Sequence, residues 1–313
     1  MTWLLALLVL ALALVSMGVT WNLISLQGWR LRRDLRKLGL SEELVDLGDA
    51  HLHVYASEPA GRTVLLLHGF GGEAAWQWPE QVRALRADGY RVVMPNLLWF
   101  GRSSSPRREF SVDRQADVVV QLLDTLGIDR ADVAGISYGG IVGWVLAARH
   151  PERVQRLVLV DAPGPEHTDD DYAAFLERFS ITDPSELLVP SQPESVTKLL
   201  DLAYSKPPPL PRFLARQIVD DMYGTDREEK VALLDDLAGN RAALRAAVPS
   251  VDAPTLLVWG EHDPVFPLDI GRRLADRLGC SLVVIPDAKH APQLEHPRAV
   301  SEALLGFLRE TSD

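Results

Sequence analysis

A serine lies at the centre of the pentapeptide Gly135-Ile136-Ser137-Tyr138-Gly139, between an apolar run and an apolar helical pattern. A serine hydroxyl can attack a carbonyl carbon when a tight strand-to-helix turn exposes it. Glycines two positions before and after the serine let the strand and the helix approach closely. The alternative interpretation is an ordinary turn with a capping serine. The apolar segments on both sides favour the nucleophilic turn.

A serine nucleophile needs a base, and the base needs an acid that orients it. Asp263 and His290 each follow a short apolar run in the C-terminal part of the chain. They are therefore expected at strand ends, where catalytic groups of open α/β sheets gather. We predict that His290 is the base for Ser137 and that Asp263 orients His290. Asp287 is an alternative acid only if Asp263 lies elsewhere.

A tetrahedral intermediate of acyl transfer needs backbone N–H donors around its oxyanion. Tyr138 follows the serine, and Phe70 lies in the glycine-rich loop 68–72, which follows another apolar run. We predict that the N–H groups of Phe70 and Tyr138 form this oxyanion hole. His68 is expected to hold the loop through a hydrogen bond, and a second base is the alternative role.

Several function classes are disfavoured by what the sequence lacks. We find no cluster with metal-ligand spacing, no G-x-G-x-x-G motif and no phosphate loop, so we expect neither a metal nor a cofactor. The formal net charge of −11 argues against nucleic acid as a partner. Cys280 is the single cysteine, which excludes an internal disulfide.

Short apolar runs alternate with helical patterns along most of the chain. This alternation predicts an α/β fold with a mostly parallel sheet covered by helices on both faces. It stops after Asp161, where proline-rich helical stretches predict a helical cap over residues 164–250. Strands are expected at 63–67, 91–94, 132–136, 154–160, 255–259 and 282–285, and helices at 76–88, 112–126, 139–149, 268–278 and 297–308.

The N-terminal segment differs from the rest because residues 3–26 carry no charged side chain. As a helix this segment would be about 36 Å long, enough to cross the hydrocarbon core of a bilayer. Trp3, Trp21 and Trp29 lie near its two ends, where aromatic rings favour the membrane interface. We predict a transmembrane anchor over residues 1–28. A cleaved signal peptide fits less well, because no Lys or Arg precedes the apolar run.

A basic segment follows the apolar one, and its leucines recur on one helical face. This pattern predicts a juxtamembrane amphipathic helix over residues 29–44. The positive-inside rule favours the cytoplasmic face for the domain, while a periplasmic or extracellular position stays open. A homodimer through the anchor helices also stays open, although no G-x-x-x-G pattern supports it. The basic residues are Arg30, Arg32, Arg33, Arg36 and Lys37.

Nearly everything after residue 45 resembles the α/β-hydrolase superfamily. The segments that carry the resemblance are LLLHGFGG, GISYGG, WGEHDPVFPL and HAPQLEHP, in that order. The likeness is greatest to monoacylglycerol lipases, carboxylesterases and meta-cleavage-product hydrolases. It implies that Ser137, Asp263 and His290 are nucleophile, acid and base. Haloalkane dehalogenases and epoxide hydrolases of this superfamily use Asp as the nucleophile, so the serine argues against those activities.

Residues 95–103 resemble the D-x-x-G-x-G-x-S loop of the same superfamily, with two departures. Asn96 replaces the usual Asp, and Phe100 replaces a smaller residue. The bulk of Trp99 and Phe100 is expected to reshape the acyl pocket. We therefore add these two aromatic residues, together with His68 and Gly69, as candidate substrate-binding residues.

The leading hypothesis is a membrane-anchored serine hydrolase that cleaves carboxylic esters of lipid-like substrates through an acyl-enzyme. A lipase, a phospholipase or an esterase would fit this description. The hydrolase core is expected in two parts, 45–163 and 251–313, on either side of the cap. One alternative is a C–C bond hydrolase of meta-cleavage products with the same triad. The other is a non-catalytic ligand-binding member of the fold.

Overall fold

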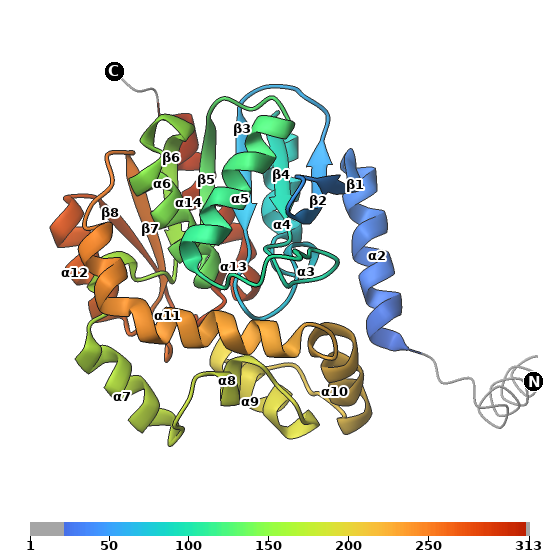
Figure 1. The fold of residues 1–313 in the computed structure, drawn as a ribbon, viewed down its shortest axis with the longest axis vertical. Helices are drawn as coiled ribbons and strands as arrows, with labels where there is room; N and C mark the ends of the chain where they lie inside the picture. Colours follow the sequence, from blue (N-terminus) through green and yellow to red (C-terminus); the bar gives the residue numbers. More distant parts are fainter. Residues whose placement is uncertain (1–21, 311–313) are drawn as a thin grey trace, which may run out of the picture.

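The computed structural model describes residues 22–310 of the chain (Figure 1). Most of the predicted anchor over residues 1–28 therefore lies outside the described residues. Within residues 22–310, no helix has the length and apolar character needed to cross a membrane.

Eight strands form one sheet within the described part of the chain, in the order β1-β2-β4-β3-β5-β6-β7-β8. β1 pairs with β2 and β2 with β4 in antiparallel fashion, and all the other neighbouring strands are parallel. The α/β fold class with a mostly parallel sheet is thereby confirmed. The strands are β1 (Leu40–Asp46), β2 (His51–Ser57), β3 (Thr63–Leu67), β4 (Arg91–Pro95), β5 (Ala131–Ile136), β6 (Val154–Val160), β7 (Thr255–Gly260) and β8 (Ser281–Ile285).

Helices cover both faces of the sheet because alternate strand residues point to opposite sides. In β3, Leu65 and Leu67 belong to one apolar cluster, while Val64 and Leu66 belong to the other. Each fully buried Leu or Val stabilises the fold by about 1.5–3 kcal/mol. The first cluster includes α5 (Val112–Thr125), α6 (Tyr138–Arg149) and α12 (Leu268–Leu278), and the second includes α2 (Leu23–Lys37), α4 (Pro79–Ala87) and α14 (Pro297–Arg309).

The helix predicted over 76–88 is in fact two helices, α3 (Ala74–Gln77) and α4. The break falls at Trp78, which ends α3 and precedes Pro79. Proline has no N–H to donate within a helix but fits its first position, so Pro79 starts a new helix instead of continuing the old one.

The predicted juxtamembrane helix over 29–44 is shifted and shortened, because α2 spans Leu23–Lys37. It begins at 23 because the Asn22 side chain accepts a hydrogen bond from the N–H of Ser25 at 2.9 Å. It ends before Gly39, whose φ of +83° a continuing helix would not allow. β1 then starts at Leu40, so the sheet begins before the boundary expected at residue 45. β1 has mostly exposed side chains, which hides its strand character in the sequence.

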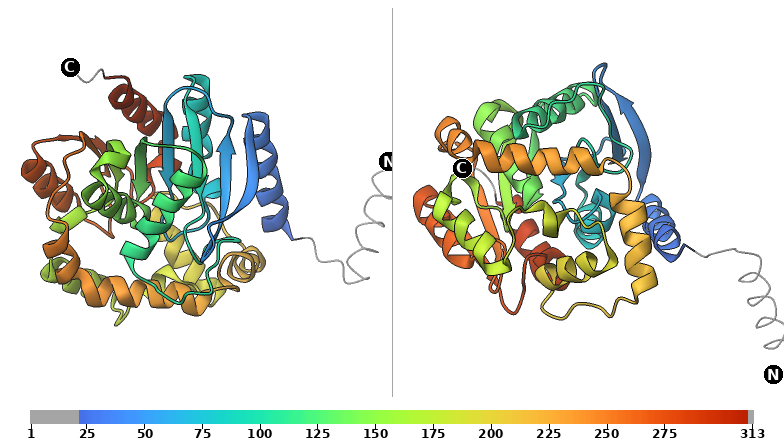
Figure 2. Two further views of the ribbon diagram at one scale, coloured as in Figure 1. Left: turned by 45° about the horizontal axis from the view of Figure 1, so that its top comes forward. Right: turned by 60° about the horizontal axis from the view of Figure 1, so that its bottom comes forward.

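A helical cap connects β6 to β7 and covers the sheet at the carboxyl ends of the parallel strands (Figures 1 and 2). Phe175, Leu187 and Leu202 of the cap form an apolar cluster with Trp259 and Phe266 of the core. The cap therefore packs on the segment that leaves β7. Its helices are α7 (Asp169–Phe179), α8 (Ser185–Leu188), α9 (Pro193–Ala203), α10 (Arg212–Ile218) and α11 (Arg227–Ala247), with a π-helical turn at Val219–Tyr223.

Candidate active site

Ser137 lies in a strained turn between β5 and α6, with φ of 51° and ψ of −120°. Such a backbone costs about 1–3 kcal/mol and persists only where the surroundings impose it. The two flanking glycines allow the surroundings to impose this conformation. A Cβ on Gly135 would lie 2.4 Å from the carbonyl oxygen of Gly139, and a Cβ on Gly139 would lie 2.4 Å from that of His68. Only glycines permit this packing of strand, helix and loop.

His290 and Asp263 meet Ser137 at the carboxyl ends of β5, β7 and β8. The Nε2 of His290 lies 3.0 Å from the Oγ of Ser137, and its Nδ1 lies 2.8 Å from the Oδ2 of Asp263. Because a carboxylate accepts, Nδ1 carries the proton and Nε2 presents its lone pair to the hydroxyl. The structure thus brings the three predicted side chains into one hydrogen-bonded chain.

Backbone groups fix the buried carboxylate of Asp263 in place. Its Oδ1 accepts hydrogen bonds from the N–H groups of Val265 at 2.7 Å and Phe266 at 3.1 Å. The side chain is fully buried. These bonds leave Oδ2 free for the imidazole. Asp287, the alternative acid, is exposed in a separate cluster with Glu261 and His262.

The cap contributes to the position of His290. The N–H of His290 donates to the carbonyl oxygen of Leu202 at 3.3 Å, and the N–H of Ala291 donates to that of Ala203 at 3.1 Å. Both acceptors lie at the end of α9. The ring of Phe266 packs against the imidazole with centroids 5.6 Å apart. The histidine loop is therefore held between the core and the cap.

Asp161, at the end of β6, is a neighbour of this site that the sequence analysis did not identify. Its carboxyl group lies within 4.8 Å of those of Asp263 and the His290 ring. Its Oδ1 accepts from the N–H of Gly260 at 2.8 Å, and its Oδ2 is buried without a partner. Burial, with the Asp263 carboxylate as a lesser cause, raises the pKa of Asp161 well above its usual value. The raised pKa favours the protonated, uncharged form of Asp161.

The loop after β3 is held by His68 and Gln77. The Nδ1 of His68 donates to the carbonyl oxygen of Gly69 at 2.8 Å, and its Nε2 accepts from the N–H of Leu97 at 2.9 Å. The Oε1 of Gln77 accepts from the N–H of Gly69 at 2.8 Å. Burial lowers the pKa of His68 to about 4, so its ring is neutral. No motif had marked Gln77, because its hydrogen bonds form only when the loop folds back against α3.

His68 holds the loop as expected. Its position does not fit the second predicted role, which was substrate binding. It is fully buried, and backbone groups occupy both of its ring nitrogens. Neither nitrogen is left for a substrate or for service as a second base.

Trp99 and Phe100 also lie outside the candidate site. The Phe100 ring packs between the rings of His68 and Phe70, at centroid distances of 4.9 and 5.1 Å. Trp99 packs against Phe110. The two rings are buried because their loop folds back onto β2, through hydrogen bonds between the backbones of residues 51 and 104. Phe100 therefore supports the glycine-rich loop 68–72, and neither ring lines the cavity at Ser137.

Phe70 and Tyr138, the predicted oxyanion donors, lie side by side, with ring centroids 4.9 Å apart. Tyr138 is the first residue of α6, so its N–H has no acceptor within the helix. A Cβ on Gly69 would lie 3.2 Å from the Cβ of Ser137. The two loops therefore meet directly beside the serine hydroxyl.

A cavity of about 670 Å³, including its mouth, opens at Ser137. Gly69, Phe70, Gln77 and His290 line it on the core side. Leucines of the cap supply much of the remaining wall, together with Ile136 and Val265. Within residues 22–310, no Lys, Arg, Asp or Glu lines it. The cavity therefore suits an uncharged, apolar group next to the serine. The cap leucines are Leu188, Leu199, Leu200 and Leu202.

Comparison with known proteins places this geometry in a family. The sequence profile of the alpha/beta hydrolase fold matches residues 62–297. The chain is an α/β hydrolase. The predicted superfamily is thereby confirmed, as is hydrolase activity in its general sense.

This α/β hydrolase has relatives with different substrates. It is 31% identical over 277 residues to a 2-hydroxymuconate semialdehyde hydrolase of Pseudomonas sp. (strain CF600), covering 80% of this chain and 88% of that protein. It is 26% identical to Lipase 3 of Moraxella sp. (strain TA144), covering 79% and 78%. The crystal structure of a membrane phospholipase A, described as a bacterial virulence factor, matches with a TM-score of 0.76 and 31% identity over 98% of both chains.

Proposed function

We propose that this α/β hydrolase cleaves carboxylic esters that carry lipid-like apolar chains, with Ser137 as the nucleophile. The observation that carries the proposal is the hydrogen-bonded chain from Asp263 through His290 to the serine Oγ, which ends at an apolar cavity. A base within 3.0 Å of a hydroxyl is in position to remove its proton.

In the proposed mechanism, His290 accepts the hydroxyl proton as Ser137 attacks the ester carbonyl carbon. Asp263 stabilises the imidazolium that forms. The N–H groups of Phe70 and Tyr138 donate to the oxyanion of the tetrahedral intermediate. The imidazolium then protonates the leaving alcohol, which leaves an acyl-enzyme. Water attacks the acyl-enzyme by the same route and releases the carboxylic acid.

The chemistry of the cavity wall supports an apolar acyl group. Leu188, Leu199 and Leu202 come from α8 and α9, so the cap supplies much of the apolar surface. Burial of a methylene against such a wall is worth about 0.8 kcal/mol. Turnover is therefore expected to improve with acyl length until the cavity is filled.

We further propose that the N-terminal segment anchors the enzyme to a membrane. α2 includes the last residues of the apolar segment, and the Nδ2 of Asn22 donates to the Asp221 carboxylate of the cap at 2.8 Å. Leu23 and Trp29 of α2 and Phe213 of α10 are exposed large hydrophobic residues, and α2 contacts α10. The similarity to a membrane phospholipase A over 98% of both chains supports the same location.

A second candidate is C–C bond hydrolysis, favoured by the 31% identity to a 2-hydroxymuconate semialdehyde hydrolase. A ring-cleavage dienoate carries a carboxylate, which binding sites usually pair with a cationic side chain. The described wall of the Ser137 cavity offers no such side chain. Ester hydrolysis therefore fits the cavity better.

The test is turnover by the full-length chain of p-nitrophenyl esters from C2 to C16, a diacylphospholipid and a ring-cleavage dienoate. We expect turnover of the longer esters, loss of turnover in Ser137→Ala, and ordinary turnover in the surface control Ser41→Ala. Turnover of the dienoate alone would establish the second candidate. Ester turnover that persists in Ser137→Ala would reject Ser137 as the nucleophile.

A further inference from the structure

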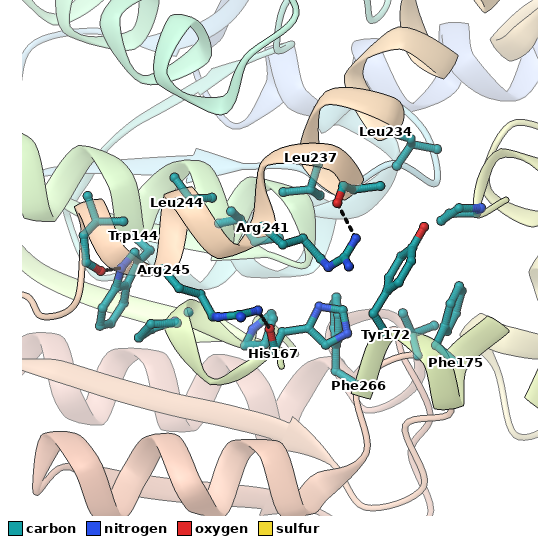
Figure 3. Close-up of a pocket in the computed structure, with 18 of the residues that line it drawn as sticks. Trp144, His167, Tyr172, Phe175, Leu234, Leu237, Arg241, Leu244, Arg245 and Phe266 are labelled. Carbon is teal, nitrogen blue, oxygen red and sulfur yellow. Dashed lines mark hydrogen bonds between the residues drawn. The ribbon is translucent and has the colours of Figure 1, made fainter. Parts of the chain in front are cut away.

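A second cavity, here called the Arg241 cavity, lies between α6 of the core and α7 and α11 of the cap (Figure 3). It measures about 790 Å³ including its mouth. Leu188 and Val265 line both this cavity and the one at Ser137, so the two cavities are neighbours. None of the residues proposed for the chemical steps of ester hydrolysis, which are Ser137, Asp263, His290, Phe70 and Tyr138, lines the Arg241 cavity.

The walls of the Arg241 cavity are mainly apolar. Ile141 and Trp144 of α6 form the core side, and Phe175 of α7 lies at the opposite end of the view in Figure 3. Leu234, Leu237 and Leu244 of α11 line the side above them. The Nε1 of Trp144 donates to the carbonyl oxygen of Val248 at 2.9 Å, so the indole presents an apolar face. An apolar lining with a few polar groups is typical of small-molecule sites.

Two arginines of α11 bring positive charge into this apolar space. The guanidinium carbon of Arg241 lies 3.7 Å from the centroid of the Tyr172 ring. Arg245 donates to the carbonyl oxygen of His167 at 2.8 Å. The Nε of Arg241 and the Nε2 of His167 are buried without partners. Polar atoms in such a position are usually hydrogen-bonded, so they point to a missing acceptor.

The acidic groups nearby lie outside the cavity wall, where Asp269 also pairs with Arg273 at 2.6 Å. The Asp169 carboxylate is shared by both arginines, at 3.2 Å from Arg241 and 3.4 Å from Arg245, and its side chain is largely exposed. Asp171 pairs with Arg273 at 2.7 Å, and Glu166 pairs with Arg277 at 2.9 Å. The single carboxylate of Asp169 therefore pairs with two guanidinium groups.

His167 adds no charge of its own. Burial, and to a lesser degree the nearby arginines, lowers its pKa to about 4, while the Asp171 carboxylate opposes the shift. The neutral ring can donate or accept one hydrogen bond through Nε2. Among the described residues, the lining of the cavity thus holds two guanidinium groups and no carboxylate, beside a neutral imidazole.

We propose that the Arg241 cavity binds an amphipathic organic anion. Its apolar chain lies along Ile141, Trp144 and the leucines of α11, and its acidic group is held by Arg241 and Arg245. Guanidinium groups form strong charge-assisted hydrogen bonds with carboxylates and phosphates, and the apolar surroundings strengthen them. A fatty carboxylate and an alkyl phosphate share this chemistry. The site is separate from ester cleavage at Ser137 and does not depend on that proposal.

The test measures binding of octanoate, octyl phosphate and octanol to the full-length chain in nanodiscs, by calorimetry against empty nanodiscs. Both anions share a chain length with the neutral alcohol, so the difference reports the acidic group. We expect at least one anion to bind more tightly than octanol. The tighter of the two anions identifies carboxylate or phosphate as the natural head group.

Charge variants locate the anion. Arg241→Met with Arg245→Met is expected to weaken anion binding by roughly tenfold to a hundredfold, the range for hydrogen bonds to charged groups. Octanol binding should be unchanged, which also shows that the variant is folded. The control Arg212→Met with Arg216→Met removes the same charge from exposed positions on α10 and should bind as the unaltered chain does.

Matched cavity-filling variants distinguish the two cavities. Ala238 lines the Arg241 cavity and Ala203 lines the Ser137 cavity. We expect Ala238→Trp to abolish binding of the anion and Ala203→Trp to preserve it. The reverse result would overturn the proposal. So would equal binding of octanoate, octyl phosphate and octanol, or anion binding that survives loss of both arginines.

Discussion

The two cavities under the cap differ in how their polar groups are held. At Ser137, the polar groups follow strand ends, and backbone N–H and C=O groups fix most of them, as for Asp263 and His68. In the Arg241 cavity, the polar groups are long side chains of α11, which reach carbonyl oxygens of the cap and share one exposed carboxylate. Bond cleavage demands positions set within fractions of an ångström, which strand ends provide. A binding site tolerates the looser placement of helix side chains.

The largest expected effect concerns the Ser137 cavity alone. Ser137→Ala should lower kcat/KM for a long-chain ester by roughly 10⁴-fold or more, because the nucleophile is lost. Affinity for the preferred amphipathic anion should not change, because Ser137 does not line the Arg241 cavity. Steady-state kinetics and calorimetry on the same preparation measure both. A parallel loss of anion affinity would show that the two cavities act as one site.

The next effect tests which acid orients His290. Asp263→Asn should lower kcat/KM by about 10³–10⁴-fold, because an amide in this place no longer selects the Nδ1–H tautomer. Asp287→Asn is the matched control and should stay within about twofold, since Asp287 is exposed in another cluster. Equal losses in the two variants would contradict the assignment of Asp263.

Substitution of one glycine in the core and one in the cap compares the rigidity of these two regions. Gly139→Ala should lower the free energy of unfolding by about 3 kcal/mol, because its Cβ would lie 2.4 Å from a backbone oxygen that cannot move. Gly239→Ala in α11 should raise it by about 0.5–1 kcal/mol, since its Cβ meets nothing within 4 Å. Chemical denaturation measures both. A destabilised Gly239→Ala would mean that the cap helix is constrained in a way the contacts do not indicate.

The first of two smaller effects is the pH dependence of stability at Asp161. Its folded pKa is raised, so the folded state retains a proton that the unfolded state loses above pH 3.8. The contribution of Asp161 to folding stability is therefore fully present below pH 3.8 and is lost as pH rises toward the folded pKa. Asp161→Asn removes this titration. The Tm of the variant should therefore increase relative to the Tm of the unaltered protein as pH rises. A constant difference in Tm would refute the raised pKa.

His167 in the cap should show the opposite sign. Its folded pKa of about 4 lies below the usual 6.5, so the unfolded state binds the extra proton between these values. Stability is therefore full above pH 6.5 and falls toward pH 4. In His167→Gln, the loss of stability between pH 6.5 and pH 4 should be smaller. Thermal unfolding from pH 4 to 7 measures this loss. Octanoate bound beside His167 should also reduce the fall in the unaltered protein, because an anion favours the imidazolium.

Much of the fold was predictable because its signals are local. β3 and β6 lie at the predicted residues, since a strand buried on both faces is a continuous apolar run. β1 and β2 were not predicted. β1 has mostly exposed side chains, and three acidic residues interrupt its apolar pattern. Edge strands are specified by pairing with a neighbour, which a window of sequence does not contain.

The turn at Ser137, the order of acid and base, and the position of the cap between two strands could all be inferred from local sequence. These features depend on glycine spacing and on apolar periodicity, which are properties of neighbouring residues. Tertiary contacts were needed to show that Asp263 and not Asp287 faces the imidazole, that His68, Trp99 and Phe100 are buried, and that Asp161 adjoins the site. Tertiary contacts were likewise needed to show that Arg241 and Arg245 lie beside a cavity. Each of these outcomes depends on which side chains arrive from distant elements, and contacts of that kind leave no local pattern in a single sequence.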